Sequence, residues 1–137
     1  MPAKNAARRP TVLAVTSDHH ANSTVSMCPP EGVRLPDGGE YHPSKANRWL
    51  WQCWEDYWRE VGALVKAHGA DLVCVFNGDA VEGEHHRNTQ VISHNPETQA
   101  YVSDRIFGVP LALKPSRTHQ PEPPAHRQGR RDPHRRP

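Results

Sequence analysis

The sequence contains no long apolar run and few cysteines, and each of these absences excludes a class of protein. Only 35% of its 137 residues are hydrophobic, and no stretch approaches the roughly 20 apolar residues that a membrane-spanning helix needs. The apolar residues 12–15, behind a basic start, are too few for a secretory signal. The three cysteines are an odd number without C-x-x-C spacing, which gives neither a disulfide framework nor a structural zinc site. We therefore expect a cytoplasmic protein with reduced thiols and no membrane partner.

The last 22 residues have almost no apolar side chains. Apart from proline, residues 116–137 contain a single one, Ala125, so this segment cannot bury a core and is expected to be disordered. Residues 1–115 carry 11 Lys/Arg and 13 Asp/Glu (net −2), whereas residues 116–137 carry 6 Arg and 2 Asp/Glu (net +4). We divide the chain into a basic lead-in (1–10), one folded domain (11–115) and a disordered Pro/Arg-rich tail (116–137).

The basic tail suggests one class of function by itself. Arginine-rich segments bind phosphate backbones without sequence preference, although a tail that is merely solvated has the same composition. One interpretation is therefore a non-catalytic module that binds nucleic acid or a protein partner through residues 116–137.

The order of the predicted elements indicates an α/β fold. Apolar runs at 11–15 and 71–76 each end in polar residues, as buried strands do. A long helix is predicted between them at 44–68, and a second helix begins after Asn95, with Pro96 in its first turn and Pro110 near its end. A strand–helix–strand unit implies a parallel pair of strands. Residues 32–35 and 40–41 are typical of a small hairpin.

The long helix has recognisable ends and a wide apolar surface. Ser44 is suited to cap its first turn, and Gly69 to end it. Residues at three- and four-residue spacing predict one buried stripe, which comprises Leu50, Trp54, Tyr57, Val61, Leu64 and Val65. Trp49, Trp51 and Trp58 widen this surface, so the helix should be covered on more than one side. A stacking platform for bases is the functional alternative to a core.

Polar clusters follow both predicted strands at their carboxyl ends, where open α/β sheets bind ligands. Asp18 and His20 follow the first strand, and their i, i+2 spacing predicts that both side chains point to one face. Asp79 follows the second strand, after a glycine, Gly78, that permits close approach of the backbone. Carboxylate and imidazole ligands suit Mn, Fe, Zn or Mg, and two such ions can polarise a phosphoryl group. The alternative is a purely structural role, since aspartate and glycine also cap loops and form turns.

The segments Ser-Asp-His-His (17–20) and Asn-Gly-Asp-Ala-Val-Glu (77–82) resemble two motifs of the calcineurin-like metallophosphoesterases, D-x-H and G-D-x-x-[DE]. Residues 10–115 as a whole resemble the N-terminal portion of a phage-type member. The resemblance implies the first part of a four-layer α/β/β/α sandwich that hydrolyses phosphate mono- or diesters at a dinuclear metal centre. The substrate is then a phosphoester, and nucleic acids and nucleotides are among the candidates.

The resemblance also implies roles for individual residues. Asp18 and His20 would bind one divalent ion, Asp79 would bridge two ions, and Glu82 would support the ligands without binding an ion itself. His85 and His86 follow the second motif closely enough to line a cleft, where one of them would contact a phosphate or protonate a leaving group. A solvated pair of loop histidines is the alternative. His19, inside the first motif, is expected to point away from the site.

The third motif of the family, G-N-H-[DE], does not occur after Asp79. The histidines beyond His94 are His119, His126 and His134, and all three lie in the Pro/Arg-rich tail. The abrupt change of composition after Pro115 suggests a shifted reading frame, with a short paralogue that has a basic tail as the alternative. By either route, the chain is expected to be weakly active or inactive as a phosphoesterase.

Overall fold

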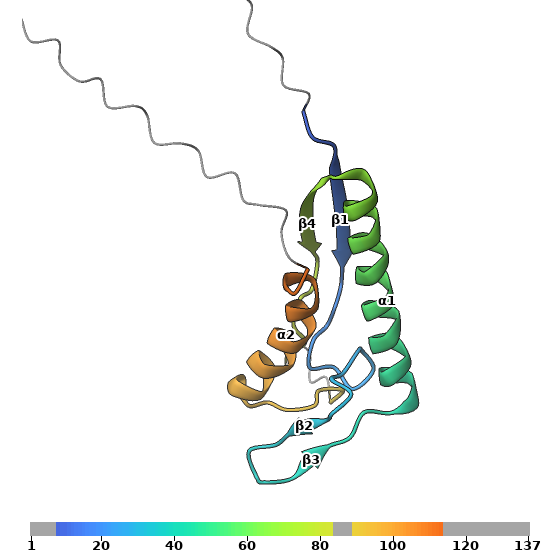
Figure 1. Ribbon diagram of the computed structural model, residues 1–137. Helices are drawn as coiled ribbons and strands as arrows, with labels where there is room; N and C mark the ends of the chain where they lie inside the picture. Colours follow the sequence, from blue (N-terminus) through green and yellow to red (C-terminus); the bar gives the residue numbers. More distant parts are fainter. Residues whose placement is uncertain (1–7, 84–88, 114–137) are drawn as a thin grey trace, which may run out of the picture.

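The computed structural model describes residues 8–83 and 89–113, and Figure 1 shows their arrangement. Two strands lie side by side and two helices flank them, with a small hairpin at the far end of the molecule. The elements are β1 (Thr11–Ser17), β2 (Val33–Arg34), β3 (Glu40–Tyr41), α1 (Lys45–His68), β4 (Asp71–Asn77) and α2 (Pro96–Leu111). The predicted tail lies outside the described residues, as does most of the lead-in.

The sheet formed by β1 and β4 confirms the predicted parallel pair. The two strands are in register over seven residues, from Thr11 opposite Asp71 to Ser17 opposite Asn77, with α1 as the connection between them. The predicted hairpin is also present, with Val33 of β2 opposite Tyr41 of β3 in antiparallel pairing. The described residues thus form a small α/β domain, as expected.

The ends of α1 lie where the capping residues predict. The Ser44 hydroxyl accepts a hydrogen bond from the Asn47 N–H (3.2 Å), and the Asn47 side chain accepts one from the Ser44 N–H (2.9 Å). This reciprocal pair satisfies donors that the first turn of a helix leaves free. At the other end Gly69 adopts a left-handed conformation with φ of 55°, which ends the helix.

The predicted apolar stripe of α1 is wrong in part, because the buried face is rotated about the helix axis. Trp54 and Val61 are buried as expected, but Trp51 and Trp58 complete that face. Tyr57 and Leu64 are exposed instead, at 36% and 49%. The three buried indoles are the largest side chains of the core. Trp54 stands at right angles to Trp58, with ring centroids 5.3 Å apart.

The second helix, α2, packs on the same core. The Asn95 side chain caps it by accepting hydrogen bonds from two N–H groups of the first turn, as predicted. Val102 and Ile106 are completely buried, and the Trp54 indole donates a hydrogen bond to the Ile106 carbonyl (2.9 Å). The helix ends at Leu111, one residue after Pro110.

The two faces of the β1–β4 sheet differ in their surroundings. Ala14 on one face is buried against the helices. The other face carries Leu13, Val15, Val73 and Val75, and these are between 40% and 61% exposed. Residues that face each other in the register share a face, so these four side chains form one patch, which we call the open sheet face. Within the described residues, each of the two strands pairs only with the other.

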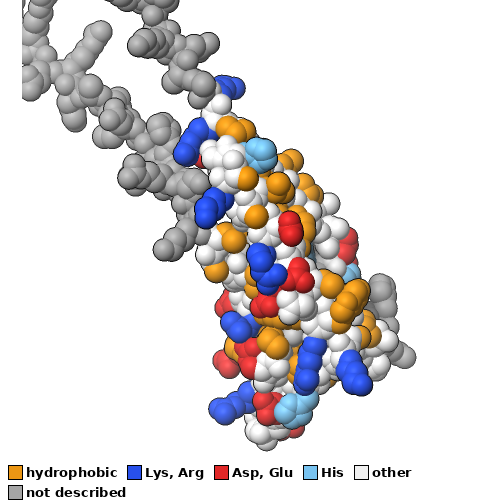
Figure 2. Space-filling view, turned by 45° about the vertical axis from the view of Figure 1, so that its right-hand side comes forward, with side chains coloured by type: hydrophobic (Ala, Val, Ile, Leu, Met, Phe, Trp, Pro, Cys, Tyr) orange, Lys and Arg blue, Asp and Glu red, His pale blue; other side chains and the backbone are white. Residues whose placement is uncertain are grey.

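The surface is otherwise mixed in character. Figure 2 shows a side of the molecule on which hydrophobic side chains lie among Lys/Arg and Asp/Glu side chains.

Neither α1 nor α2 combines the length and hydrophobicity that a membrane span requires. The three cysteines are free thiols, and burial raises the pKa of Cys28 to about 12.

Candidate metal centre

The two polar segments that follow β1 and β4 continue side by side beyond the sheet. Asp18 donates a backbone hydrogen bond to the Asn77 carbonyl (3.1 Å), and His20 donates one to the Asp79 carbonyl (2.9 Å). The pairing extends to a parallel bridge between residues 21 and 81. The two motif segments are therefore brought together, as the parallel arrangement predicts.

The predicted reason for the shared direction of Asp18 and His20 is wrong, although the side chains do converge. Strand alternation does not apply, because β1 ends at Ser17. Both residues instead adopt left-handed backbone conformations, with φ of 54° at Asp18 and 46° at His20. Such conformations are uncommon outside glycine and are concentrated at functional sites.

Three side chains meet at this point with the chemistry of a metal site. One ligand atom from each of Asp18, His20 and Asp79 lies within 4.8 Å of the other two. The two carboxylates are exposed and the imidazole is half-buried, so the group is open to solvent. Two carboxylate oxygens and one imidazole nitrogen form a donor set that Mn, Fe, Zn and Mg accept.

Gly78 makes room for the Asp18 carboxylate. It has φ of 67°, and a Cβ added to it would lie 2.9 Å from Asp18 Cγ and closer still to Oδ1. Any side chain at this position would push the Asp18 carboxylate away. The prediction that a glycine permits close approach is thus confirmed, and the group it admits is the proposed ligand itself.

The Asp18 carboxylate is held in its ionised form. Hydrogen bonds from the Ser17 side chain and from the Asp79 N–H (3.5 Å) lower the pKa of Asp18 below its ordinary value. Hydrogen bonds to a carboxylate favour its charged state. Asp18 therefore presents a negative charge at neutral pH, as a metal ligand must.

Glu82 contacts the proposed ligand His20. Its Oε2 lies 2.6 Å from His20 Nδ1, and its side chain is only 13% exposed. In metal sites a carboxylate commonly accepts the second ring N–H of a ligating histidine and fixes its orientation. The contact is the one expected of a residue that supports the ligands.

His19 points away from this group, into the core, as expected. It is 4% exposed, and its ring packs edge-on against Trp54, Phe76 and Phe107 at centroid distances of 5.0–5.7 Å. Its Nε2 lies 2.9 Å from the Thr16 hydroxyl. Burial lowers the pKa of His19 below its ordinary value, so the ring is neutral at pH 7.

The loop behind the ligands is held by Asn22, which the sequence analysis missed. Asn22 is fully buried and has φ of 80°. Its side chain donates to the Ser93 carbonyl (2.9 Å) and accepts from the Ser93 N–H (3.1 Å). These bonds tie the segment that carries His20 to the chain that precedes α2. A lone asparagine in a loop gave no periodic signal for this role.

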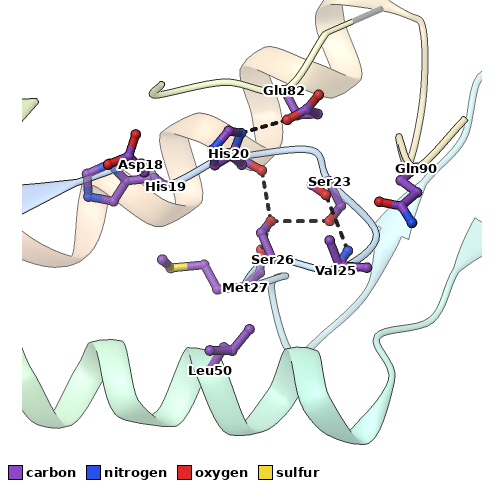
Figure 3. Close-up of a pocket in the computed structure, with 10 residues that line it drawn as sticks. All are labelled: Asp18, His19, His20, Ser23, Val25, Ser26, Met27, Leu50, Glu82 and Gln90. Atoms are coloured by element: carbon purple, nitrogen blue, oxygen red, sulfur yellow. Dashed lines mark hydrogen bonds and ion pairs between the residues drawn. The ribbon is translucent and has the colours of Figure 1, made fainter. Parts of the chain in front are cut away.

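A pocket of about 400 Å³ opens beside the ligand group (Figure 3). Asp18, His20 and Glu82 lie at its upper edge, and Met27 and Leu50 lie together below them. Its remaining lining residues are His19, Ser23, Val25, Ser26 and Gln90. The helical spacing predicts Leu50 in the core stripe, and no sequence pattern marks the others apart from His19, because they come from irregular loops.

Two of the predicted site residues lie outside the described part of the chain. These are His85 and His86, the candidates for contact with a phosphate or for protonation of a leaving group. The tail histidines also lie outside it, whereas His94 is described and exposed.

No family model, curated protein or solved structure matches this chain. Function must therefore be argued from the geometry of the site.

Proposed function

We propose that this chain carries part of the dinuclear metal centre of a phosphoesterase that hydrolyses phosphate mono- or diesters. One observation supports this most strongly: Asp18, His20 and Asp79 converge within 4.8 Å at the carboxyl ends of two paired parallel strands. Accidental carboxylate clusters are common on protein surfaces. This one is distinguished by the glycine beside Asp18 and the carboxylate on His20.

In the proposed centre each residue has a separate task. Asp18 and His20 would hold one divalent ion, and Asp79 would provide a carboxylate to that ion and to a second. Glu82 accepts the Nδ1 proton of His20 and so leaves Nε2 as the nitrogen for the metal. Bound divalent ions supply Lewis-acid polarisation of the phosphoryl group. The Asp18 and Asp79 carboxylates provide the negative charge that concentrates such cations.

We further propose that the described residues are part of a four-layer α/β/β/α sandwich. The helices cover one face of the β1–β4 sheet, and the open sheet face presents Leu13, Val15, Val73 and Val75 to solvent. Apolar surface of this kind is normally covered by another layer. A second sheet on that face would give the layer order of the sandwich.

The proposed centre is incomplete within residues 8–83 and 89–113. These residues contain a single group of three or more metal-ligating side chains within ligand distance, and a second ion requires further ligands. We therefore expect one Mn²⁺ to bind weakly and phosphoester turnover to be close to background, since two-metal hydrolysis uses both ions.

Calorimetry with Mn²⁺ and release of nitrophenol from bis(p-nitrophenyl) phosphate test this proposal on the full chain. One weak site that Asp79→Asn weakens further is the expected result. Asp104→Asn is the matched control, because Asp104 is an exposed aspartate on α2. A Mn²⁺ affinity that is unchanged in Asp79→Asn would contradict the proposal. Salt-sensitive DNA binding that disappears without residues 116–137 would favour the nucleic-acid-binding alternative.

A further inference from the structure

The pocket beside the proposed ligands has two chemically different parts. Asp18, His20 and Glu82 line one part, and the other is built on apolar side chains. Met27 comes from the loop that follows β1, and Leu50 comes from an early turn of α1. Figure 3 shows the two side chains next to each other beneath the segment that carries Asp18 and His20. Both are half-buried, so they are accessible from the pocket.

We infer that this apolar part binds an uncharged aryl or branched-alkyl group of the substrate against Met27 and Leu50. The inference rests on the proposed function, which places the phosphoryl end of the same molecule at Asp18, His20 and Asp79. It assigns the pocket to the organic group that the phosphate ester carries.

The size of the pocket fits a small organic group. Its volume of about 400 Å³ lies in the range of small-molecule sites, which are lined mainly by apolar side chains with a few polar groups. Methionine adapts its shape readily and packs well against aromatic rings. Leu50 is displaced from the buried face of α1 by the rotation of that face, and this displacement leaves it at the pocket.

The polar residues at this end are largely engaged by their own loop. The Ser26 hydroxyl donates to the His20 carbonyl (2.8 Å), and the Ser23 hydroxyl accepts a hydrogen bond from the Val25 N–H (3.3 Å). These hydroxyls therefore hold the loop in shape. The apolar surface that they leave for a ligand is provided by Met27 and Leu50, with the exposed Val25 beside them.

The charge of the pocket selects against a second anionic group. The carboxylates of Asp18 and Glu82 both line it, and they repel any negative group that the bound metal does not neutralise. An uncharged aryl or alkyl group meets no such repulsion. The pocket therefore favours a phosphoester with a neutral organic group over a polyphosphate.

Binding of phenylphosphonate and methylphosphonate to the full chain with Zn²⁺ tests this inference. Burial of most of a phenyl ring predicts about tenfold tighter binding of phenylphosphonate. Leu50→Gln and, separately, Met27→Gln should remove most of that preference. Leu64→Gln is the matched control, because Leu64 is an exposed leucine on the same helix. Equal binding of the two phosphonates would overturn the inference.

The chain offers a direct probe of the pocket, since it contains only two methionines, Met1 and Met27. With ¹³C-methyl methionine, phenylphosphonate should shift the Met27 signal through the ring current and leave Met1 unchanged. Methylphosphonate should shift neither signal by that mechanism. A Met27 signal that phenylphosphonate does not move would contradict the inference.

Benzyl alcohol added to the metal-free chain separates this inference from the proposed function. A shift of Met27 without any binding of Mn²⁺ would overturn the metal centre and support the apolar site. Mn²⁺ binding with no response of Met27 to either aromatic probe would overturn the apolar site and leave the metal centre standing.

Discussion

The Asp18 carboxylate lies against the Cα of Gly78, in space that the Cβ of any other residue would occupy. That hypothetical Cβ is 2.9 Å from Asp18 Cγ, closer than atoms of this kind approach one another. The two residues belong to different motifs, one after β1 and one after β4. The contact therefore couples the packing of the two strand ends to the position of a proposed metal ligand.

Gly78→Ala should weaken Mn²⁺ binding at least tenfold, because the new methyl group displaces the Asp18 carboxylate. It should also lower the free energy of unfolding by about 1 kcal/mol or more, since alanine is strained at positive φ. Gly38→Ala is the control: Gly38 has φ of 85° but nothing within 4 Å of an added Cβ. It should show the stability loss alone. Equal effects of both variants on Mn²⁺ binding would refute this prediction.

Glu82→Gln should weaken Mn²⁺ binding by about 10–100-fold, the usual effect of removing a carboxylate that orients a ligating histidine. The amide keeps the size of the side chain but not the charge that faces His20 Nδ1 at 2.6 Å. Free Mn²⁺ measured by EPR in a titration reports the affinity. Glu60→Gln, at an exposed position of α1, should leave it unchanged. The prediction fails if the two variants bind alike.

Acid should destabilise the fold through His19. Burial lowers the pKa of His19 below its unfolded value of 6.5, so below pH 6.5 the unfolded chain binds the proton more strongly. The neutral His19 ring therefore stabilises the fold fully above pH 6.5, and this stabilisation declines as the pH falls below that value. Urea midpoints at pH 7.5 and 5.5 measure this loss. Part of it should vanish in His19→Phe but persist in His42→Gln, since His42 is exposed. An equal pH dependence in all three proteins would argue against this assignment.

Polar substitutions on the open sheet face should reduce aggregation without loss of stability. Val15 and Val75 are 54% and 40% exposed, and threonine has the same shape and also favours strands. The double variant Val15→Thr/Val75→Thr should remain monomeric at higher concentration in light scattering, with an unchanged urea midpoint. Val61→Thr, at a buried position of α1, should lower the midpoint instead. Unaltered aggregation of the double variant would show that the open sheet face is not the surface through which the molecules associate.

The element order was predictable because local signals were strong and consistent. Proline and glycine mark the turns, Ser44 and Asn95 cap the helices, and two apolar runs define the parallel pair. The buried face of α1 could not be predicted in the same way. Leu50, Trp54 and Tyr57 have the same three- and four-residue spacing as Trp51, Trp54 and Trp58. Periodicity alone cannot choose between two adjacent apolar faces, and the choice depends on packing against α2 and the sheet.

At the candidate site, the convergence of Asp18 and Asp79 was predictable from the topology, because parallel strands end at the same edge. The way Asp18 and His20 come together was not, since it depends on left-handed conformations that no pattern signals. The pocket was also missed, because Ser23, Met27 and Gln90 lie in irregular loops. Such loops are positioned by buried contacts like those of Asn22, which only the folded structure shows.

Electron spin-echo spectroscopy of Mn²⁺ bound to the full chain tests most directly whether Asp18, His20 and Asp79 form a metal centre. A directly bound imidazole couples the manganese electron spin to ¹⁴N, whereas carboxylate and water ligands give no such coupling. We expect one histidine nitrogen coupling that His20→Gln removes and His42→Gln retains. A manganese signal without ¹⁴N coupling, or one that His20→Gln leaves unchanged, would contradict the proposed centre.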